Sequence, residues 1–346
     1  MSTRPIVVKL GGDALATPAR IAAQARRLAR WAEAGPVVAV ASARRGVTDH
    51  LLGLVGEIEA VTGSENATPD AHLEADRAVS SGEVVSAALL ALALNRLGWH
   101  AVSLDAREAG ILARGPRGDG RIRRIQAGRI RQLYERGIIP VITGFQGWQD
   151  GRVVTLGRGG SDTSAVALAD ALGAGQVVFV KDAAGLRTAD PKLVPDTAPI
   201  HEAPHAFLTA LTRAGAKVVH AHAAALTEAK GLPLEFWTLE GDEPASVVRH
   251  GVVPALPLRA AAVTPPLGET VDVTVLGVEP EARARVGARL EQELRASGVS
   301  EPALSDLPEG IRVTVPAALA GEALRIAHRV AGQVARPVAI PTRLAS

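Results

Sequence analysis

Short apolar runs alternate with stretches of helical periodicity through residues 1–250. The runs have the length and β-branched content of buried strands, and between them apolar residues recur as on one face of an α-helix. This alternation predicts an α/β fold, with a mostly parallel sheet covered by helices on both faces. The predicted strands are Ile6–Leu10, Val37–Ser42, Ala101–Asp105, Ile138–Thr143, Gln176–Lys181 and Leu234–Trp237. The predicted helices are Ala19–Glu33, Asp70–Leu97, Arg129–Arg136, Ser161–Leu172 and His205–Ala214.

The pattern changes after Arg249. Residues 251–268 contain four prolines and little periodicity, which is typical of a linker between domains. The residues beyond it predict the order βαββαβ, the ferredoxin-like arrangement. Its strands are Val271–Leu276, Glu301–Asp306, Gly310–Val315 and Ala335–Ile340, and its helices are Glu279–Ser297 and Ala318–Gln333. The predicted domains are therefore residues 1–250 and 269–346, joined by 251–268.

Composition excludes several kinds of chemistry. The 346 residues include no cysteine, so disulfides, thiolate metal sites and cysteine nucleophiles are excluded. Lys+Arg total 38 against Asp+Glu 36, a balance that gives no support to nucleic-acid binding. The arginine-rich stretch Arg114–Arg131 could be a phosphate-binding patch. We expect a solvated helix face instead, because Ile122, Ile125 and Ile130 supply a buried side and no aromatic residue interleaves.

Targeting signals are not apparent in the sequence. Met1–Lys9 is too short and too soon interrupted by Gly11 and Gly12 to be a signal peptide. No segment reaches the ~18 uncharged apolar residues that a bilayer requires. We therefore expect a cytoplasmic protein without a membrane partner.

The stretch 153–162, VVTLGRGGSD, is suited to an anionic ligand. Its glycines allow close backbone approach, and the amide groups at the start of the following helix favour negative charge. Arg158 adds a planar fork that matches a carboxylate or phosphate. An ordinary glycine-rich turn is the alternative, but such a turn does not need Arg158, Ser161 and Asp162 together.

Polar residues also follow the first two predicted strands. Lys9 precedes paired glycines, an arrangement that suits phosphoryl transfer although the Walker pattern is absent. Ser42 and Thr48 are suited either to bonding a polar ligand or to capping the next helix. Glu83 lies within or at the start of an apolar helix. Its carboxylate is suited either to an ammonium group or to the positive end of the helix dipole.

Four motifs, in this order, resemble those of the aspartate kinases of the amino-acid kinase family. They are KLGGDAL from Lys9, SARRGVTD from Ser42, the SGE of Ser81–Glu83, and TGFQG followed by TLGRGGSD ending at Asp162. The similarity continues through KDAAGLRTADP from Lys181 and GAKVVH from Gly215. Several motifs in register over residues 1–250 are far more specific than one glycine-rich loop.

The resemblance implies a three-layer αβα sandwich, with L-aspartate in the N-terminal half and MgATP in the C-terminal half. The implied reaction is phosphorylation of the aspartate side-chain carboxylate to 4-phospho-L-aspartate, the first step towards lysine, threonine and methionine. It implies that Lys9, Asp162 and Lys217 are catalytic. Mg²⁺ would bridge phosphate oxygens, with no dedicated metal site in the protein.

The resemblance also assigns binding residues. Those implied for L-aspartate are Ser42, Thr48, Glu83, Arg158 and Ser161. Those implied for ATP are Lys9, Gly11, Gly12, Lys181, Asp182, Gly185, Arg187, Asp190, Pro191 and Lys217.

Several positions depart from the family motifs. The usual Thr-Ser is Asp13-Ala14, which places a negative charge near incoming phosphate. In the nucleotide segment Lys181 replaces Thr, Ala184 replaces Asp and Arg187 replaces an aromatic residue, and Ala221-His222 replaces Pro-Arg or Pro-Lys. These changes leave two alternatives open: a non-catalytic regulatory or scaffold subunit, and a kinase of another amino acid.

The C-terminal residues fit one ACT-like module, whereas typical aspartate kinases carry two. ACT-like modules usually pair, so we expect a homodimer or higher homo-oligomer through this domain. An effector-binding role and a purely oligomeric role both remain open for it.

Overall fold

The computed structural model describes residues 4–63, 68–182, 185–251, 259–266 and 268–333. Contacts divide the chain into two compact units, Met1–Gly185 with Val218–Val252, and Leu186–Lys217 with Val253–Ser346.

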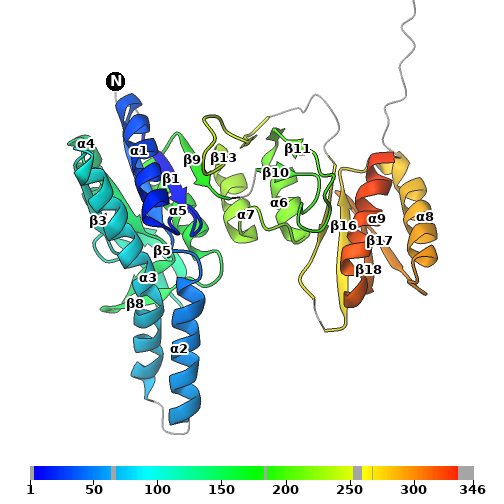
Figure 1. Ribbon diagram of the computed structural model, residues 1–346, viewed down its shortest axis with the longest axis horizontal. Helices are drawn as coiled ribbons and strands as arrows, with labels where there is room; N and C mark the ends of the chain where they lie inside the picture. Colours follow the sequence, from blue (N-terminus) through cyan, green and yellow to red (C-terminus); the bar gives the residue numbers. More distant parts are fainter. Residues whose placement is uncertain (1–3, 64–67, 183–184, 252–258, 267, 334–346) are drawn as a thin grey trace, which may run out of the picture. The chain divides into compact units, whose positions relative to one another are not determined.

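A mostly parallel sheet forms the centre of the first unit (Figure 1). Within the first unit, its strands in spatial order are β14 (Ser246–Val248), β13 (Leu234–Trp237), β9 (Gln176–Val180), β1 (Ile6–Leu10), β2 (Val37–Ala41), β6 (Ile139–Thr143) and β3 (Ala101–Leu104). Neighbouring strands are parallel except β14, which is antiparallel to β13. The six strands predicted for this region are confirmed to within a residue at their ends.

Helices cover both faces of this sheet. On one face, α1 (Pro18–Ala34) and α3 (Pro69–Arg96) pack on Val8 and Leu10 in one core. Successive side chains of a strand point to opposite faces, so Lys9 points to the other face, where α5 (Gly160–Leu172) contacts β1. The remaining helices of the unit are α2 (Val47–Thr62), α4 (Gly128–Glu135) and α7 (Ala221–Lys230). The three-layer prediction is confirmed.

Helix α3 is apolar and long enough over Asp70–Arg96 to span a membrane by composition. Half of its most apolar stretch is buried in the protein, as in a core helix of a globular domain. Its N-terminal part packs against α2 through a small cluster of Val55, Ala75 and Val79.

A second sheet in the first unit was not predicted. Its strands in spatial order are β5 (Arg121–Ile125), β4 (Ile111–Arg114), β7 (Gln146–Gln149) and β8 (Arg152–Thr155). The expectation of a helix face over Arg114–Arg131 is therefore wrong up to α4. Residues 121–125 form an edge strand whose hydrogen bonds come from pairing with β4, a tertiary contact that overrides local periodicity.

The second unit contains an antiparallel sheet with helices on one face (Figure 1). The spatial order is β15 (Ala260–Val263), β16 (Thr270–Leu276), β18 (Gly310–Pro316) and β17 (Ala303–Leu307), covered by α8 (Pro280–Ala296) and α9 (Ala320–Gln333). A short 3₁₀ helix, η1 (Ala317–Leu319), precedes α9. This is the expected ACT-like arrangement. Strand β15 lies within the stretch predicted as a linker, and the predicted strand Ala335–Ile340 lies outside the described residues.

Residues 186–217 pack in this second unit. They contain β10 (Leu186–Arg187), β11 (Pro199–Ile200), β12 (Glu202–Ala203) and α6 (His205–Arg213). Ala189 and Val194 share a core with the C-terminal sheet. The Thr188 Oγ1 atom lies 2.8 Å from His328 Nε2, and Ala261 N–H donates to the Thr188 carbonyl. The compact units therefore follow tertiary contacts that cross the domain boundary expected from sequence.

Candidate functional site

The candidate site lies where β1, β2 and β9 end. In the register of these parallel strands Leu10 pairs with Val180, so Gly11 and Lys181 follow at the same edge. Gly11 N–H donates to the Val180 carbonyl at 3.2 Å, and Ser42 N–H donates to the Leu10 carbonyl at 3.1 Å. Ligands of open α/β sheets bind at this carboxyl edge.

Two lysines hold one buried carboxylate at this edge. Lys9 Nζ lies 2.9 Å from Asp162 Oδ1, and Lys181 Nζ lies 3.5 Å from Asp162 Oδ2. Their side chains are 9%, 9% and 20% exposed in the order Lys9, Asp162 and Lys181. Burial alone would raise the pKa of Asp162, but Lys181 and Lys9 hold it well below its usual range. Asp162 is therefore ionised and orients both ammonium groups.

The glycine-rich turn before α5 places Asp162. Gly157 and Gly159 both have left-handed φ angles, 72° and 74°, and α5 begins at Gly160. A Cβ on Gly159 would lie 2.3 Å from the His220 ring, so this position accommodates only glycine without a shift. His220 N–H in turn donates to Asp162 Oδ2 at 3.2 Å.

The remaining residues predicted in this motif lie beside Asp162. Ser161 is buried against Gly144, where an added Cβ would lie 2.7 Å from the Ser161 hydroxyl. Arg158 is exposed at the turn. The start of α5 therefore presents backbone N–H groups together with an exposed guanidinium, an arrangement suited to an anion.

Glu83 lies in the interior of α3 and is only 3% exposed. Its Oε1 accepts from Ala43 N–H at 3.1 Å, while among the described residues its buried Oε2 has no hydrogen-bond partner. Burial raises the pKa of Glu83 to about 7, against the opposing effects of the Ala43 N–H and Lys9. The alternative of a helix-start glutamate is wrong, because α3 begins at Pro69.

Close packing brings Glu83 to the loop after β2. A Cβ on Gly82 would lie 2.9 Å from that of Ala43, so the glycine permits α3 to approach this loop. The capping alternative for Ser42 and Thr48 is also wrong. Helix α2 starts at Val47 after a left-handed Gly46, with no side-chain cap, and Thr48 lies inside the helix.

Asp13 does not present an uncompensated charge. Arg45 Nη1 lies 2.6 Å from Asp13 Oδ1, and Arg45 N–H donates to the Gly12 carbonyl. In the motifs that this chain resembles, Thr stands at position 13 in place of Asp13, and Gly stands at position 45 in place of Arg45. Both departures therefore occur together and offset each other in charge.

The predicted nucleotide residues divide between the units. Lys181, the exposed Asp182 and Gly185 belong to the first unit, and Gly185 has a left-handed φ of 68°. Arg187, Asp190, Pro191 and Lys217 belong to the second unit. There, Arg187 Nε donates to Thr197 Oγ1 at 2.6 Å and Asp190 Oδ1 accepts from Lys192 N–H at 2.9 Å. The structure thus brings together Lys9, Glu83, Asp162 and Lys181, with Gly11, Gly12 and Ser42 at the same strand ends.

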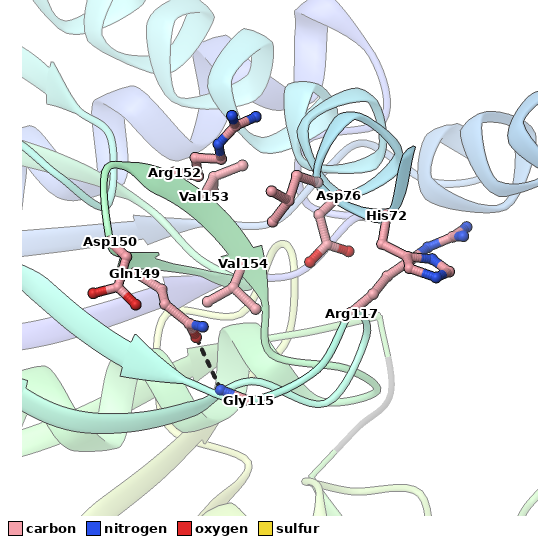
Figure 2. A pocket seen from close by; sticks show the side chains of 10 residues that line it. His72, Asp76, Gly115, Arg117, Gln149, Asp150, Arg152, Val153 and Val154 are labelled. Atoms are coloured by element: carbon pink, nitrogen blue, oxygen red, sulfur yellow. Dashed lines mark hydrogen bonds between the residues drawn. The ribbon is translucent and has the colours of Figure 1, made fainter. Parts of the chain in front are cut away.

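Sequence reasoning missed Asp76, a buried carboxylate on α3. Asp76 accepts from Thr155 N–H at 2.9 Å and from the Thr155 hydroxyl at 2.8 Å, which ties α3 to the strand before the glycine-rich turn. Asp76 lines a cavity of about 260 Å³. Figure 2 shows Asp76 there, with His72 and Arg117 among the other lining residues. A larger hollow of about 720 Å³ lies nearby between α3 and Trp148. Neither is lined by Lys9, Glu83 or Asp162. Among the described residues, no group of three or more His, Asp or Glu could hold a metal ion.

A parallel αβα sheet with paired lysines and a glycine-rich turn at its carboxyl edge is an arrangement suited to phosphoryl transfer. Residues 4–236 match the model of the amino acid kinase family, and the chain belongs to this family.

Among curated proteins, the chain is similar to aspartokinases. It is 34% identical to that of Corynebacterium efficiens over 291 residues, 81% of this chain and 66% of the relative. It is 36% identical to that of Geobacillus stearothermophilus over 278 residues, 79% of this chain and 66% of the relative. The chain thus spans about two thirds of the length of these relatives.

Solved structures of aspartate kinases share the fold of this chain. The aspartate kinase of Synechocystis is 31% identical, with a TM-score of 0.61 over 97% of this chain and 57% of that one. Aspartokinase III of E. coli, solved with aspartate and ADP, shares the fold at 22% identity, with a TM-score of 0.67 over 91% of this chain and 79% of that one.

Proposed function

We propose that this protein is an ATP-dependent aspartate kinase that forms 4-phospho-L-aspartate. The observation that carries the proposal is the buried Lys9–Asp162–Lys181 cluster beside Glu83, at the carboxyl edge of the sheet. Similarity to the aspartokinases of Corynebacterium and Geobacillus supports aspartate as the acceptor. The ion pair of Asp13 with Arg45 removes the charge-based reason for a non-catalytic scaffold.

Aspartate binding requires partners for an ammonium and two carboxylates. The free oxygen of Glu83 is the partner for the substrate ammonium, since it is buried and otherwise unpaired among the described residues. Arg158 clamps the α-carboxylate in a two-pronged contact, because its planar fork matches that geometry. Ser42, Thr48 and Ser161 supply hydroxyl groups around the substrate.

The transfer itself needs positioning more than covalent chemistry. An oxygen of the aspartate side-chain carboxylate attacks the γ-phosphorus of ATP. The bond from that phosphorus to the bridging β–γ oxygen breaks, and ADP leaves with the electron pair. Lys9 offsets charge on the transferred group, and Asp162 holds the Lys9 ammonium in place. Mg²⁺ carried in with ATP supplies further positive charge at the phosphate oxygens.

The nucleotide and the assembly are also part of the proposal. Gly11 and Gly12 present backbone to the phosphates. For the rest of ATP the proposal keeps the residues that the resemblance assigns, which are Lys181, Asp182, Gly185, Arg187, Asp190, Pro191 and Lys217. We assign the kinase domain to residues 1–250 and the ACT-like domain to residues 269–346, with β15 of the intervening stretch as an added edge strand of the ACT-like sheet. We infer that this domain pairs between copies in a homodimer or higher homo-oligomer, because among the described residues β17 is a mostly exposed edge strand of its sheet. With ATP as substrate, the protein is expected in the cytoplasm.

Hydroxamate trapping of the acyl phosphate tests this function. With MgATP and a panel of aspartate, glutamate and N-acetylglutamate, we expect product with aspartate. Measurable aspartate binding without product at any enzyme concentration would reject the kinase and favour the scaffold alternative. Product with another amino acid alone would reject aspartate as the acceptor.

The variant Arg158→Ala tests the assigned clamp. Loss of a bidentate charged contact is expected to raise the KM for aspartate at least tenfold, with the KM for ATP changed less than threefold. Arg129→Ala, which removes an exposed guanidinium paired with Glu108, serves as the matched control. Equal weakening of aspartate and ATP would contradict the role given to Arg158.

A further inference from the structure

Lys181 stands where the aspartate kinase motifs that this chain resembles have threonine. It directly follows β9, the neighbour of β1 in the sheet, and therefore emerges beside the residues that follow Lys9. Its Nζ lies 3.5 Å from Asp162 Oδ2 and donates to the Val218 carbonyl. The replacement thus introduces an ammonium group into the centre of the site.

The net charge of the Lys9–Asp162–Lys181 cluster indicates a role for the Lys181 ammonium. Lys9 and Asp162 alone form a neutral pair, and Lys181 gives the cluster a surplus positive charge at a side chain that is only 20% exposed. A largely buried surplus cation is costly unless an anion offsets it. Burial lowers the pKa of Lys181, and Asp162 and the solvent-exposed Asp182 oppose this effect. Glu83 is the other acidic group near Lys9, and the proposed function uses its free oxygen for the substrate ammonium. The surplus charge is then available for a phosphate.

We propose that Lys181 is the second lysine that binds the phosphoryl group during transfer, with Asp162 holding its ammonium and that of Lys9 on either side. This inference deepens the proposed function and rests on it. The resemblance gives a phosphate role to Lys217, which is exposed and belongs to the second unit. Lys181 carries the second positive charge within the first unit itself, at the same sheet edge as Lys9.

A purely structural role is the competing explanation, since Lys181 also ties the end of β9 to Val218. Variants Lys181→Thr, which restores the family residue, and Lys181→Met separate the two roles. Lys230→Thr is the matched control, because Lys230 is likewise paired to an aspartate of α5, Asp170, at 2.8 Å. Lys217→Met compares the two candidate phosphate lysines.

Two measurements on the whole 346-residue chain distinguish the phosphate-binding role from the structural role. The first is kcat for aspartyl phosphate, which we expect to fall about 100-fold in both Lys181 variants, the size of effect seen when one charge-stabilising donor is lost. The second is calorimetric binding of the ATP analogue AMP-PNP and of ADP. We expect AMP-PNP to weaken about tenfold and ADP less than threefold, because only the analogue carries a γ-phosphoryl group.

The inference is overturned if Lys181→Thr keeps kcat within threefold of wild type. It is also overturned if AMP-PNP and ADP weaken equally while the melting temperature drops, since that pattern reports lost structure. Failure of the proposed function would give a different result, which is the absence of aspartyl phosphate with the wild-type protein. If the wild type makes no acyl phosphate from aspartate, the AMP-PNP preference and its dependence on Lys181 still decide the role of this lysine.

Discussion

Replacement of Glu83 by glutamine is expected to stabilise the protein while weakening its binding of aspartate. The carboxyl of Glu83 is 3% exposed, keeps one oxygen without a hydrogen-bond partner among the described residues, and has its pKa raised by burial. Ionising this group in the folded state is therefore costly. Glutamine has the same shape, accepts the same bond from Ala43 N–H, and carries no charge.

The size of the expected gain in the free energy of unfolding follows from the raised pKa of Glu83. Moving it from 4.5 to about 7 corresponds to about 3 kcal/mol at ~1.4 kcal/mol per pH unit. The unfolded chain releases this proton near pH 4.5 and the folded protein only near 7, so the cost of ionisation grows as pH rises through that window. The stability gained by Glu83→Gln should be about 1 kcal/mol at pH 5.5 and about 3 kcal/mol at pH 8.5.

Tryptophan fluorescence during urea unfolding measures this gain in the first unit. All four tryptophans lie there: Trp31, Trp99, Trp148 and Trp237. Glu74→Gln, an exposed change on the same helix, is the control and should shift the free energy of unfolding by less than about 0.5 kcal/mol at both pH values. The KM for aspartate should rise at least tenfold in Glu83→Gln. If Glu83→Gln gives no gain in stability, or a gain that does not grow with pH, then ionisation of Glu83 in the folded protein is not costly and the reasoning is refuted.

Two further predictions concern the turn before α5 and the loop charges. Gly159→Ala should cost more than about 2 kcal/mol and abolish activity, because the new Cβ meets the His220 ring. Gly173→Ala, also at a left-handed φ but with nothing within 4 Å, should cost only about 1 kcal/mol, and equal losses in urea unfolding would exclude the contact with His220. A double-mutant cycle of Asp13→Ala and Arg45→Ala should give a coupling energy of about 0.2–1 kcal/mol, since the two side chains are 24% and 69% exposed. A coupling near zero would remove the pair as compensation for the two motif changes.

The central sheet was predictable because each of its main strands has a recognisable local sequence pattern. Each strand buried on both faces reads as a continuous apolar run, and β1, β2, β6 and β9 are buried in this way. The sheet β5-β4-β7-β8 was not predictable. Its strands are short and mixed in polarity, and β5 is mostly exposed, so only pairing with β4 makes it a strand.

The site was likewise predictable in part. Motif spacing identified Lys9, Glu83, Asp162 and the glycine-rich turn, and the structure brings these residues to one sheet edge. Asp76 gave no signal, because an aspartate near the start of a helix looks like a surface residue until its partner Thr155 is known. The packing of residues 186–217 in the second unit was equally invisible, since it depends on contacts such as Thr188 with His328.

The sequence by itself determined the alternation of strands and helices, the family and the residues available for chemistry, because these follow from periodicity and from motifs that are local in the chain. Only the tertiary structure decided which charges meet. The register of β1 and β9 places Lys9 and Lys181 at one edge, and the close approach of α5 puts Asp162 between them. Such distances depend on pairing between segments more than 150 residues apart, and Coulomb energies change steeply over those few ångströms.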